Sequence, residues 1–161
     1  MGEIIRVGMA EYKICKMPDK ITTIGLGSCV GVVLYDEKTQ IAGLLHAMLP
    51  DYYAIKNNTN RQKFVNSGLT DMIEDLNKAG ADVNSLKAKM AGGARMFKFN
   101  YMNETSNIGE KNVKSTKEML QAMGIPLVGE DTGLNYGRTV LFDPATYELQ
   151  IMCVGKEMKR I

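Results

Sequence analysis

The chain has 161 residues, of which 45% are hydrophobic, so residues 1–161 are expected to form a single domain with a packed core. Its 20 basic and 18 acidic side chains leave a formal net charge of +2, a balance that argues against nucleic acid as the main partner. We see no signal-peptide pattern and no apolar run long enough to cross a bilayer, and therefore expect a cytoplasmic protein that is not inserted in a membrane.

Strands dominate the first part of the chain. Alternating apolar residues predict an opening strand over residues 4–14 and a β-branched run predicts a second over 21–24, which leads into the glycine-rich turn Gly25-Leu26-Gly27-Ser28. Two apolar runs, 30–35 and 41–48, flank a polar segment at 36–39 and are typical of a β-hairpin.

The rest of the chain mixes helices with strands. Apolar residues at helical spacing predict helices over 61–79 and 110–123, which end at Gly80 and Gly124. Further strands are predicted at 86–91, 125–128, 138–142 and 147–154, and the polar segment 100–107 reads as a surface loop. These elements predict an α+β fold, a sandwich of mixed or antiparallel sheets with the two amphipathic helices packed on one side.

The cysteines and the single histidine limit the chemistry. Cys15, Cys29 and Cys153 show none of the short spacings of a zinc site, so we expect reduced thiols with no metal and no organic cofactor. His46 is the only histidine of the sequence. Any cysteine–histidine pair must therefore use it as the base.

The expected hairpin brings one cysteine to this histidine. If residues 36–39 form a four-residue loop, facing residues have numbers that sum to 75, and Cys29 lies opposite His46. Directly opposed residues of an antiparallel pair point to the same face with Cβ atoms about 4.5–5.5 Å apart. The inference depends on the loop length, because a one-residue slip would turn one side chain to the other face.

Such a pair is suited to nucleophilic catalysis. A neighbouring imidazolium lowers the pKa of a thiol, and the imidazole can then transfer protons. The glycine-rich turn before Cys29 lets a substrate approach the backbone, whose N–H groups are candidates for an oxyanion hole. Thr23 is placed to hydrogen-bond His46 and orient its ring. From composition alone, Cys29 would be a buried structural thiol, and a lone histidine such as His46 is more often a satisfied core residue.

Five segments of the chain resemble the CheD family of chemoreceptor glutamine deamidases. In family order they are Gly25-Leu26-Gly27-Ser28-Cys29-Val30, His46-Ala47-Met48-Leu49-Pro50, Ala88-Lys89-Met90-Ala91-Gly92-Gly93-Ala94 with Met96-Phe97, Asn107-Ile108-Gly109 with Asn112, and Glu130-Asp131-Thr132-Gly133. The resemblance spans about residues 4–154, nearly the whole chain.

The resemblance implies a nucleophile at Cys29, a base at His46 and an assisting Thr23. It also implies a sandwich fold shared with the deamidating bacterial toxins of the cytotoxic necrotising factor type. The expected reaction hydrolyses selected glutamine side chains of methyl-accepting chemotaxis receptors to glutamate. A CheC-type phosphatase, which acts on the response regulator CheY, is a further expected partner, and the chain itself is expected to be a monomer.

Some points stay open at this stage. Leu134 stands where the family usually has a glycine, and a positive φ there would cost a leucine about 1 kcal/mol or more. The loop with Gly92-Gly93 and Phe97 is a candidate anchor for a partner, although Phe97 also fits a core residue. Two other functions fit the same residues: a binding module that mainly stimulates a CheC-type phosphatase, and a cysteine peptidase or transglutaminase.

Overall fold

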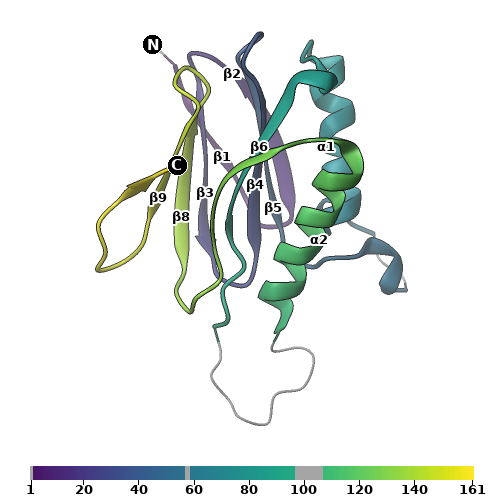
Figure 1. Ribbon diagram of the computed structural model, residues 1–161, viewed down its shortest axis with the longest axis vertical. Coiled ribbons are helices and arrows are strands. Elements are labelled where there is room, and N and C mark those ends of the chain that lie inside the picture. Colours follow the sequence, from purple (N-terminus) through teal and green to yellow (C-terminus); the bar gives the residue numbers. More distant parts are fainter. Residues whose placement is uncertain (1, 57–58, 97–106) are drawn as a thin grey trace.

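A computed structural model describes residues 2–56, 59–96 and 107–161 of the chain. Two five-stranded mixed sheets lie face to face, and two helices cover the outer face of one of them (Figure 1). The predicted α+β sandwich with both helices on one side is therefore confirmed.

The sheet farther from the helices has the strand order β1-β3-β8-β9-β10. Its strands are β1 (Ile4–Val7), β3 (Lys20–Leu26), β8 (Arg138–Asp143), β9 (Glu148–Met152) and β10 (Lys159–Arg160). Strand β1 runs parallel to β3, and the other neighbours are antiparallel.

The sheet beneath the helices has the order β2-β5-β4-β6-β7. Its strands are β2 (Glu11–Lys16), β5 (Ile41–Ala47), β4 (Val30–Asp36), β6 (Leu86–Gly92) and β7 (Leu127–Thr132). Every residue of β4 and β5 is buried. These two strands have a core on each face, which explains why their sequences read as continuous apolar runs.

The helices are α1 (Val65–Lys78) and α2 (Ile108–Met123), with short 3₁₀ turns η1 (Tyr52–Ala54), η2 (Arg61–Lys63) and η3 (Val83–Ser85). Helix α1 starts later than predicted, because residues 61–63 form a 3₁₀ turn. Helix α2 ends at Gly124 in the left-handed conformation (φ 70°), as the glycine predicted.

Two core layers follow from this arrangement. One lies between the helices and the adjacent sheet, and includes Val32, Leu45, Leu69 and Leu120. The other lies between the two sheets. Because side chains alternate along a strand, even and odd positions of β4 and β5 belong to different layers. The inter-sheet layer contains the residues that the sequence marked as candidates.

Three predicted strands differ from those observed. The expected strand at 4–14 is two strands, β1 and β2, in different sheets, joined through a turn at Ala10 with φ 60°. The strand predicted at 125–128 is β7, which runs over 127–132. The segment that includes Glu130 and Asp131 pairs on one side only, at the edge of its sheet, where polar side chains reach solvent. The strand predicted over 147–154 is the shorter β9. The two-residue strand β10 was not predicted.

Candidate active site

The candidate site lies where the chain crosses from one sheet to the other. Strand β3 ends at Leu26, residues 27–29 form a bend, and β4 begins at Val30 in the opposite sheet. Just before the crossing, the pairing of β3 with β8 shifts between Thr23 and Leu26. Gly25 has φ 76° in this bulge, a conformation that glycine adopts without strain. The bulge redirects the chain towards Cys29.

The hairpin register differs from the predicted one. Strands β4 and β5 pair Asp36 with Ile41 and Gly31 with His46, so the loop comprises residues 37–40 and facing numbers sum to 77. Cys29 is therefore not directly opposite His46, and that prediction is wrong by two residues. A shift of two keeps every side chain on its face, because the strand period is two. Cys29 and His46 accordingly both belong to the inter-sheet side.

The physical reason for the shift is Asp36, which was read as a turn residue. Its carboxylate is buried and accepts hydrogen bonds from the Lys38 N–H (3.1 Å), the Thr39 hydroxyl (2.9 Å) and the Asp82 N–H (2.9 Å). Burial raises the pKa of this carboxyl, but the hydrogen bonds outweigh it and the pKa lies below the usual value. Asp36 is thus a satisfied strand residue that caps the loop.

His46 is held by Thr23 across the two sheets. The Thr23 hydroxyl donates to the Val7 carbonyl at 2.8 Å and lies 2.7 Å from Nδ1 of His46. A hydroxyl has one hydrogen, and the Val7 carbonyl can only accept, so the imidazole Nδ1–H must donate to the threonine oxygen. This contact fixes the tautomer with Nε2 unprotonated. The hydrogen bond that the sequence suggested between these residues is present.

The other ring nitrogen of His46, Nε2, is buried and, in the described structure, unpaired. His46 is 1% exposed, and its Nε2 has no hydrogen-bond partner among the described residues. Burial lowers the pKa of His46 below its ordinary value, so the ring is neutral at pH 7. A neutral imidazole whose Nε2 is unprotonated and unpaired can accept a proton from a donor that comes within hydrogen-bond reach.

Cys29 lies at the crossing and is 8% exposed. Burial raises the pKa of its thiol, and its own backbone N–H lowers that pKa by a smaller amount. Within the described part of the chain no hydrogen bond joins the thiol to His46. The two pKa directions oppose the thiolate–imidazolium pair that the sequence suggested. In this state both groups are neutral.

The bend that carries Cys29 is held through its carbonyls. Gly93 N–H donates to the Cys29 carbonyl at 2.8 Å, and Ala94 N–H donates to the Gly27 carbonyl at 2.9 Å. By contrast, within the described residues the N–H groups of Gly27, Ser28 and Cys29 make no backbone hydrogen bond. Because the Cys29 N–H interacts with its own thiol, the N–H groups of Gly27 and Ser28 are the two successive donors left next to it.

Asn112 of helix α2 completes this frame, although sequence reasoning gave it no role. It is fully buried, and its Nδ2 donates to the carbonyls of Ser28 (2.9 Å) and Met48 (3.0 Å). A signal was available: Ile108, Asn112, Thr116 and Leu120 are spaced by four, so a polar amide falls on the inward stripe of an amphipathic helix.

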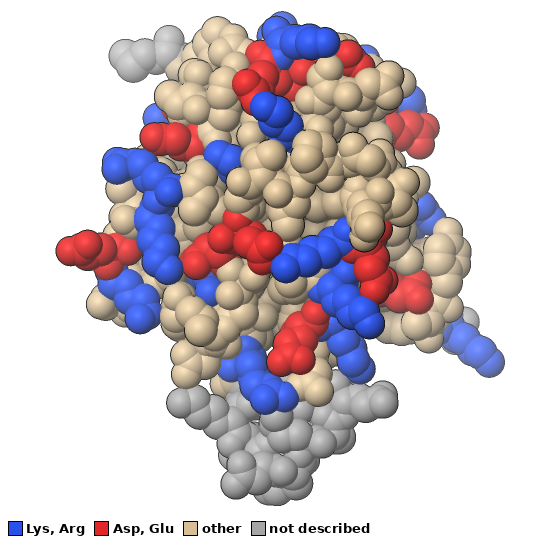
Figure 2. All heavy atoms as spheres, in the orientation of Figure 1, with Lys and Arg blue, Asp and Glu red and all other residues tan. Residues whose placement is uncertain are grey.

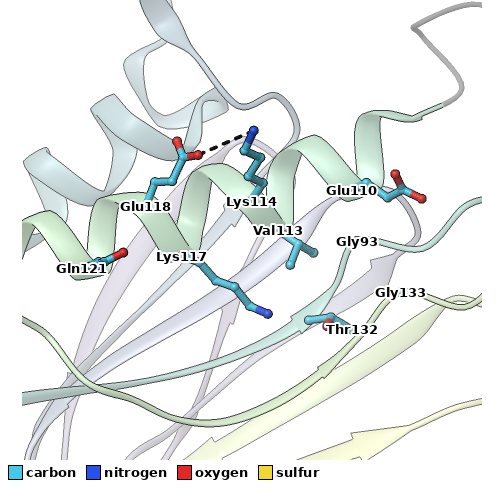
Figure 3. A pocket seen from close by; sticks show the side chains of 9 residues that line it. All are labelled: Gly93, Glu110, Val113, Lys114, Lys117, Glu118, Gln121, Thr132 and Gly133. Atoms are coloured by element: carbon cyan, nitrogen blue, oxygen red, sulfur yellow. Dashed lines mark ion pairs between the residues drawn. The ribbon is translucent and has the colours of Figure 1, made fainter.

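A cleft of about 350 Å³ adjoins the frame between α2 and the ends of β6 and β7. Figure 3 shows Val113 and Lys117 reaching from the helix towards Gly93 and Thr132, while Lys114 is turned away and pairs with Glu118. The cleft meets the Cys29 bend only through the backbone of Gly93. Among the described residues that line this cleft there is no cysteine or histidine.

On the face in Figure 2, basic and acidic side chains are interspersed. Over the described ranges, no group of three or more His, Cys, Asp or Glu side chains is placed to hold a metal ion. No helix in the part of the chain that the structure describes is long and apolar enough to span a membrane.

Two further predictions have mixed outcomes. Leu134 has φ 60°, so the position that the family usually gives to glycine does require the left-handed conformation. Its carbonyl accepts a hydrogen bond from the Arg95 N–H at 2.8 Å. Phe97, the suggested partner anchor, and residues 100–106 of the predicted surface loop lie outside the described residues.

Comparison with known proteins gives consistent matches. The family model described as CheD chemotactic sensory transduction matches residues 48–153. A probable chemoreceptor glutamine deamidase CheD from Lachnoclostridium phytofermentans is 52% identical over 100% of both chains. One from Caldanaerobacter subterraneus subsp. tengcongensis is 48% identical over 99% of each. The chemoreceptor glutamine deamidase CheD of Bacillus licheniformis is 49% identical over 98% of this chain and 95% of that protein.

Among solved structures, the hypothetical protein YfiH of Bacillus licheniformis matches with a TM-score of 0.49 and 14% identity, over 78% of this chain and 51% of that one. This likeness is too distant to bear on the function. The expected relation to deamidating toxins stays a prediction.

Proposed function

Because this chain belongs to the CheD family, we propose that it is a chemoreceptor glutamine deamidase that uses Cys29 as its nucleophile. Relatives named for that activity match at about half identity over essentially the whole chain. The observation that carries the catalytic part of the proposal is the bare, buried Nε2 of His46, whose tautomer Thr23 fixes beside the Cys29 crossing.

The first step forms a thioester. As a glutamine carboxamide enters, Nε2 of His46 accepts the thiol proton of Cys29, and Sγ attacks the side-chain carbonyl carbon. The carbonyl electron pair moves to oxygen, and the N–H groups of Gly27 and Ser28, which make no backbone hydrogen bond among the described residues, are the candidate donors that stabilise it. The imidazolium then returns its proton to the amide nitrogen, the C–N bond breaks and ammonia leaves.

The second step releases glutamate. His46 accepts a proton from water, whose oxygen attacks the thioester carbon, and the C–S bond breaks. The thiolate of Cys29 regains the proton from the imidazolium. Cys29 precedes the β4–β5 ladder, so in this proposal substrate binding brings its thiol within hydrogen-bond reach of the His46 Nε2. Proton transfer is thus confined to the bound complex.

Thr23 has a supporting role in both steps. Its oxygen accepts the Nδ1–H of His46 and stabilises the imidazolium when it forms. Because its own hydrogen is committed to the Val7 carbonyl, Thr23 cannot donate to the ring. The imidazole therefore keeps Nε2 as its basic atom throughout the cycle.

The test is incubation with the cytoplasmic domain of a methyl-accepting chemotaxis receptor, followed by peptide mass spectrometry for a gain of about 1 Da at glutamine. We expect conversion with release of ammonia. Cleavage of the receptor chain would identify a peptidase, and incorporation of an added amine would identify a transglutaminase. An intact, unmodified receptor would contradict the proposal.

The expected CheC-type partner belongs to the same proposal as a second ligand. Its binding and the monomeric state follow from the family resemblance and from no contact in the structure. If receptor and phosphatase share the Cys29 mouth, saturating phosphatase slows deamidation. Undiminished turnover at saturation would assign the partner to another surface.

A further inference from the structure

We propose that Asn112 is a positioning residue that holds the Cys29 bend in register with the end of the His46 strand. This inference rests on the proposed function, since it assigns Asn112 to the same reaction. One amide nitrogen donates both hydrogens, one to Ser28 and one to Met48. Ser28 precedes the nucleophile by one residue, and Met48 follows the base by two.

The orientation of this amide is determined by its surroundings. With the group reversed, Oδ1 would face two carbonyl oxygens and repel both. In the observed orientation Oδ1 is buried and has no partner in the described part of the chain. The molecule thus leaves one buried acceptor unsatisfied, which costs stability, while both donors are used. Among neutral side chains, only those of Asn and Gln supply two N–H donors from one nitrogen.

Helix α2 is itself fixed against the same frame. A Cβ atom at Gly109 would lie 2.4 Å from the Ala94 carbonyl oxygen, so the first turn of α2 packs directly on the backbone after β6. That backbone donates to the carbonyls of Gly27 and Cys29. With Asn112 on Ser28, all three carbonyls of the bend are engaged by donors from the body of the protein. The bend is therefore held in one position.

Positioning of this kind matters because no ladder pairing sets the distance between thiol and imidazole. Cys29 precedes β4 and lies outside its register with β5. Among the described residues, the Asn112 side chain links the two segments directly through hydrogen bonds. A displacement of about 1 Å between reacting groups can lower a rate about a hundredfold. We expect Asn112→Ala to lower kcat by about that factor and to change KM little.

The test uses two readouts that move in opposite directions. Asn112→Ala should slow receptor deamidation, and it should speed alkylation of Cys29 by iodoacetamide at one fixed alkaline pH. Freed from Ser28, the bend exposes the thiol, and the thiol pKa falls towards its ordinary value. Asn112→Asp keeps the volume but places a carboxylate against two carbonyls, and should act likewise.

Matched controls are present in the chain. Ser115, also on α2, donates to the Pro50 carbonyl at 3.1 Å, and Ser115→Ala should leave both readouts unchanged. Cys15 is buried in β2 and reports general loosening of the fold. Equal acceleration of labelling at Cys15 and Cys29 would assign Asn112 to stability alone and overturn the proposal, as would unchanged kcat and Cys29 labelling.

A double-mutant cycle separates this proposal from the proposed function. Once His46 is replaced by alanine, the relation between base and nucleophile no longer exists, so adding Asn112→Ala should cost little more. A full additional loss in that background would contradict the inference. Failure of the wild-type protein to deamidate any receptor would contradict the proposed function, while Cys29 labelling would still decide whether Asn112 holds the bend.

Discussion

Cys15 and Cys29 lie near opposite ends of β5 on the same inter-sheet layer, and both are buried. Cys15 sits inside β2 and pairs in a regular ladder with Ala42. Cys29 precedes β4 in a bend whose N–H groups make no backbone bond among the described residues. Burial raises the pKa of both thiols, that of Cys15 to about 12, with Asp19 and Asp143 adding to the effect.

Burial and the direction of the pKa shift are therefore common to the two cysteines. What distinguishes the Cys29 end is a set of polar groups with unused hydrogen-bonding capacity: the bend N–H groups and the Nε2 of His46. Around Cys15 the backbone is paired, and the thiol lies in the apolar inter-sheet layer. Buried polar atoms without hydrogen-bond partners cost stability, and in proteins they often mark functional sites.

The largest effect should come from the nucleophile. Cys29→Ala should lower receptor deamidation by more than about 10⁴-fold, because it removes the atom that forms the thioester. Cys15→Ala should retain most activity, since it lies in a paired strand away from the base. Ammonia release and peptide mass spectrometry measure both. Appreciable turnover by Cys29→Ala would remove the basis of the comparison.

The base should come next. His46→Ala should reduce kcat by about 10²–10⁴-fold. Because burial lowers the pKa of His46, the acid limb of the wild-type kcat/KM profile should have its midpoint below the ordinary value of 6.5. A limb centred above 6.5 would instead indicate an imidazolium stabilised in the free protein.

The same lowered pKa has a consequence for stability. The unfolded chain takes up the His46 proton at higher pH than the folded protein, so stability is present above pH 6.5 and is lost as the pH falls below it. Urea unfolding across this range should show the loss in wild type and less of it in His46→Gln. An equal loss in both proteins would assign the effect to other groups.

Which of these features the sequence could predict depends on how local they are. The face shared by Cys29 and His46 followed from strand alternation, and Thr23 reaches the ring as expected. The register of β4 with β5 could not be predicted from the sequence. It depends on the Asp36 carboxylate, which accepts a hydrogen bond from the N–H of Asp82, 46 positions away. The pKa directions also require the fold, since burial sets them. In the sequence Asn112 is visible as a polar residue on the apolar stripe of α2, but its hydrogen-bond partners depend on where α2 packs.

Thr23 allows a smaller and sharper test. Thr23→Val preserves shape but leaves the imidazole Nδ1–H and the Val7 carbonyl unpaired, which costs about 1–3 kcal/mol. We expect kcat to fall about tenfold to a hundredfold, because the tautomer and the imidazolium lose their support. The neighbouring Thr22 donates to the Val140 carbonyl at 2.6 Å, and Thr22→Val is the control. Equal kcat in the two variants would mean that Thr23 only stabilises the fold.

The smallest expected effect concerns backbone strain, which both ends of the molecule carry. Leu134 (φ 60°) bonds the backbone beside the Cys29 frame, and Gln40 (φ 57°) bonds the Met17 N–H near the Cys15 end. The left-handed conformation costs a residue with a side chain about 1–2 kcal/mol, and glycine avoids this cost. Glycine also loses more conformational entropy on folding, which offsets about 0.5–1 kcal/mol of the gain. Leu134→Gly and Gln40→Gly should each raise the free energy of unfolding by about 0.5–1 kcal/mol, measured by urea denaturation.

Activity then tells the two strained positions apart. Leu134 accepts from Arg95 through its backbone carbonyl and its side chain is 62% exposed, so glycine keeps the contact and removes little packing. If the strain at Leu134 is a tolerated substitution, kcat is unchanged in both variants. If the leucine side chain at this edge contacts the receptor, Leu134→Gly raises KM while Gln40→Gly does not. Destabilisation by Leu134→Gly would show that packing of the leucine side chain contributes more to stability than its positive φ costs.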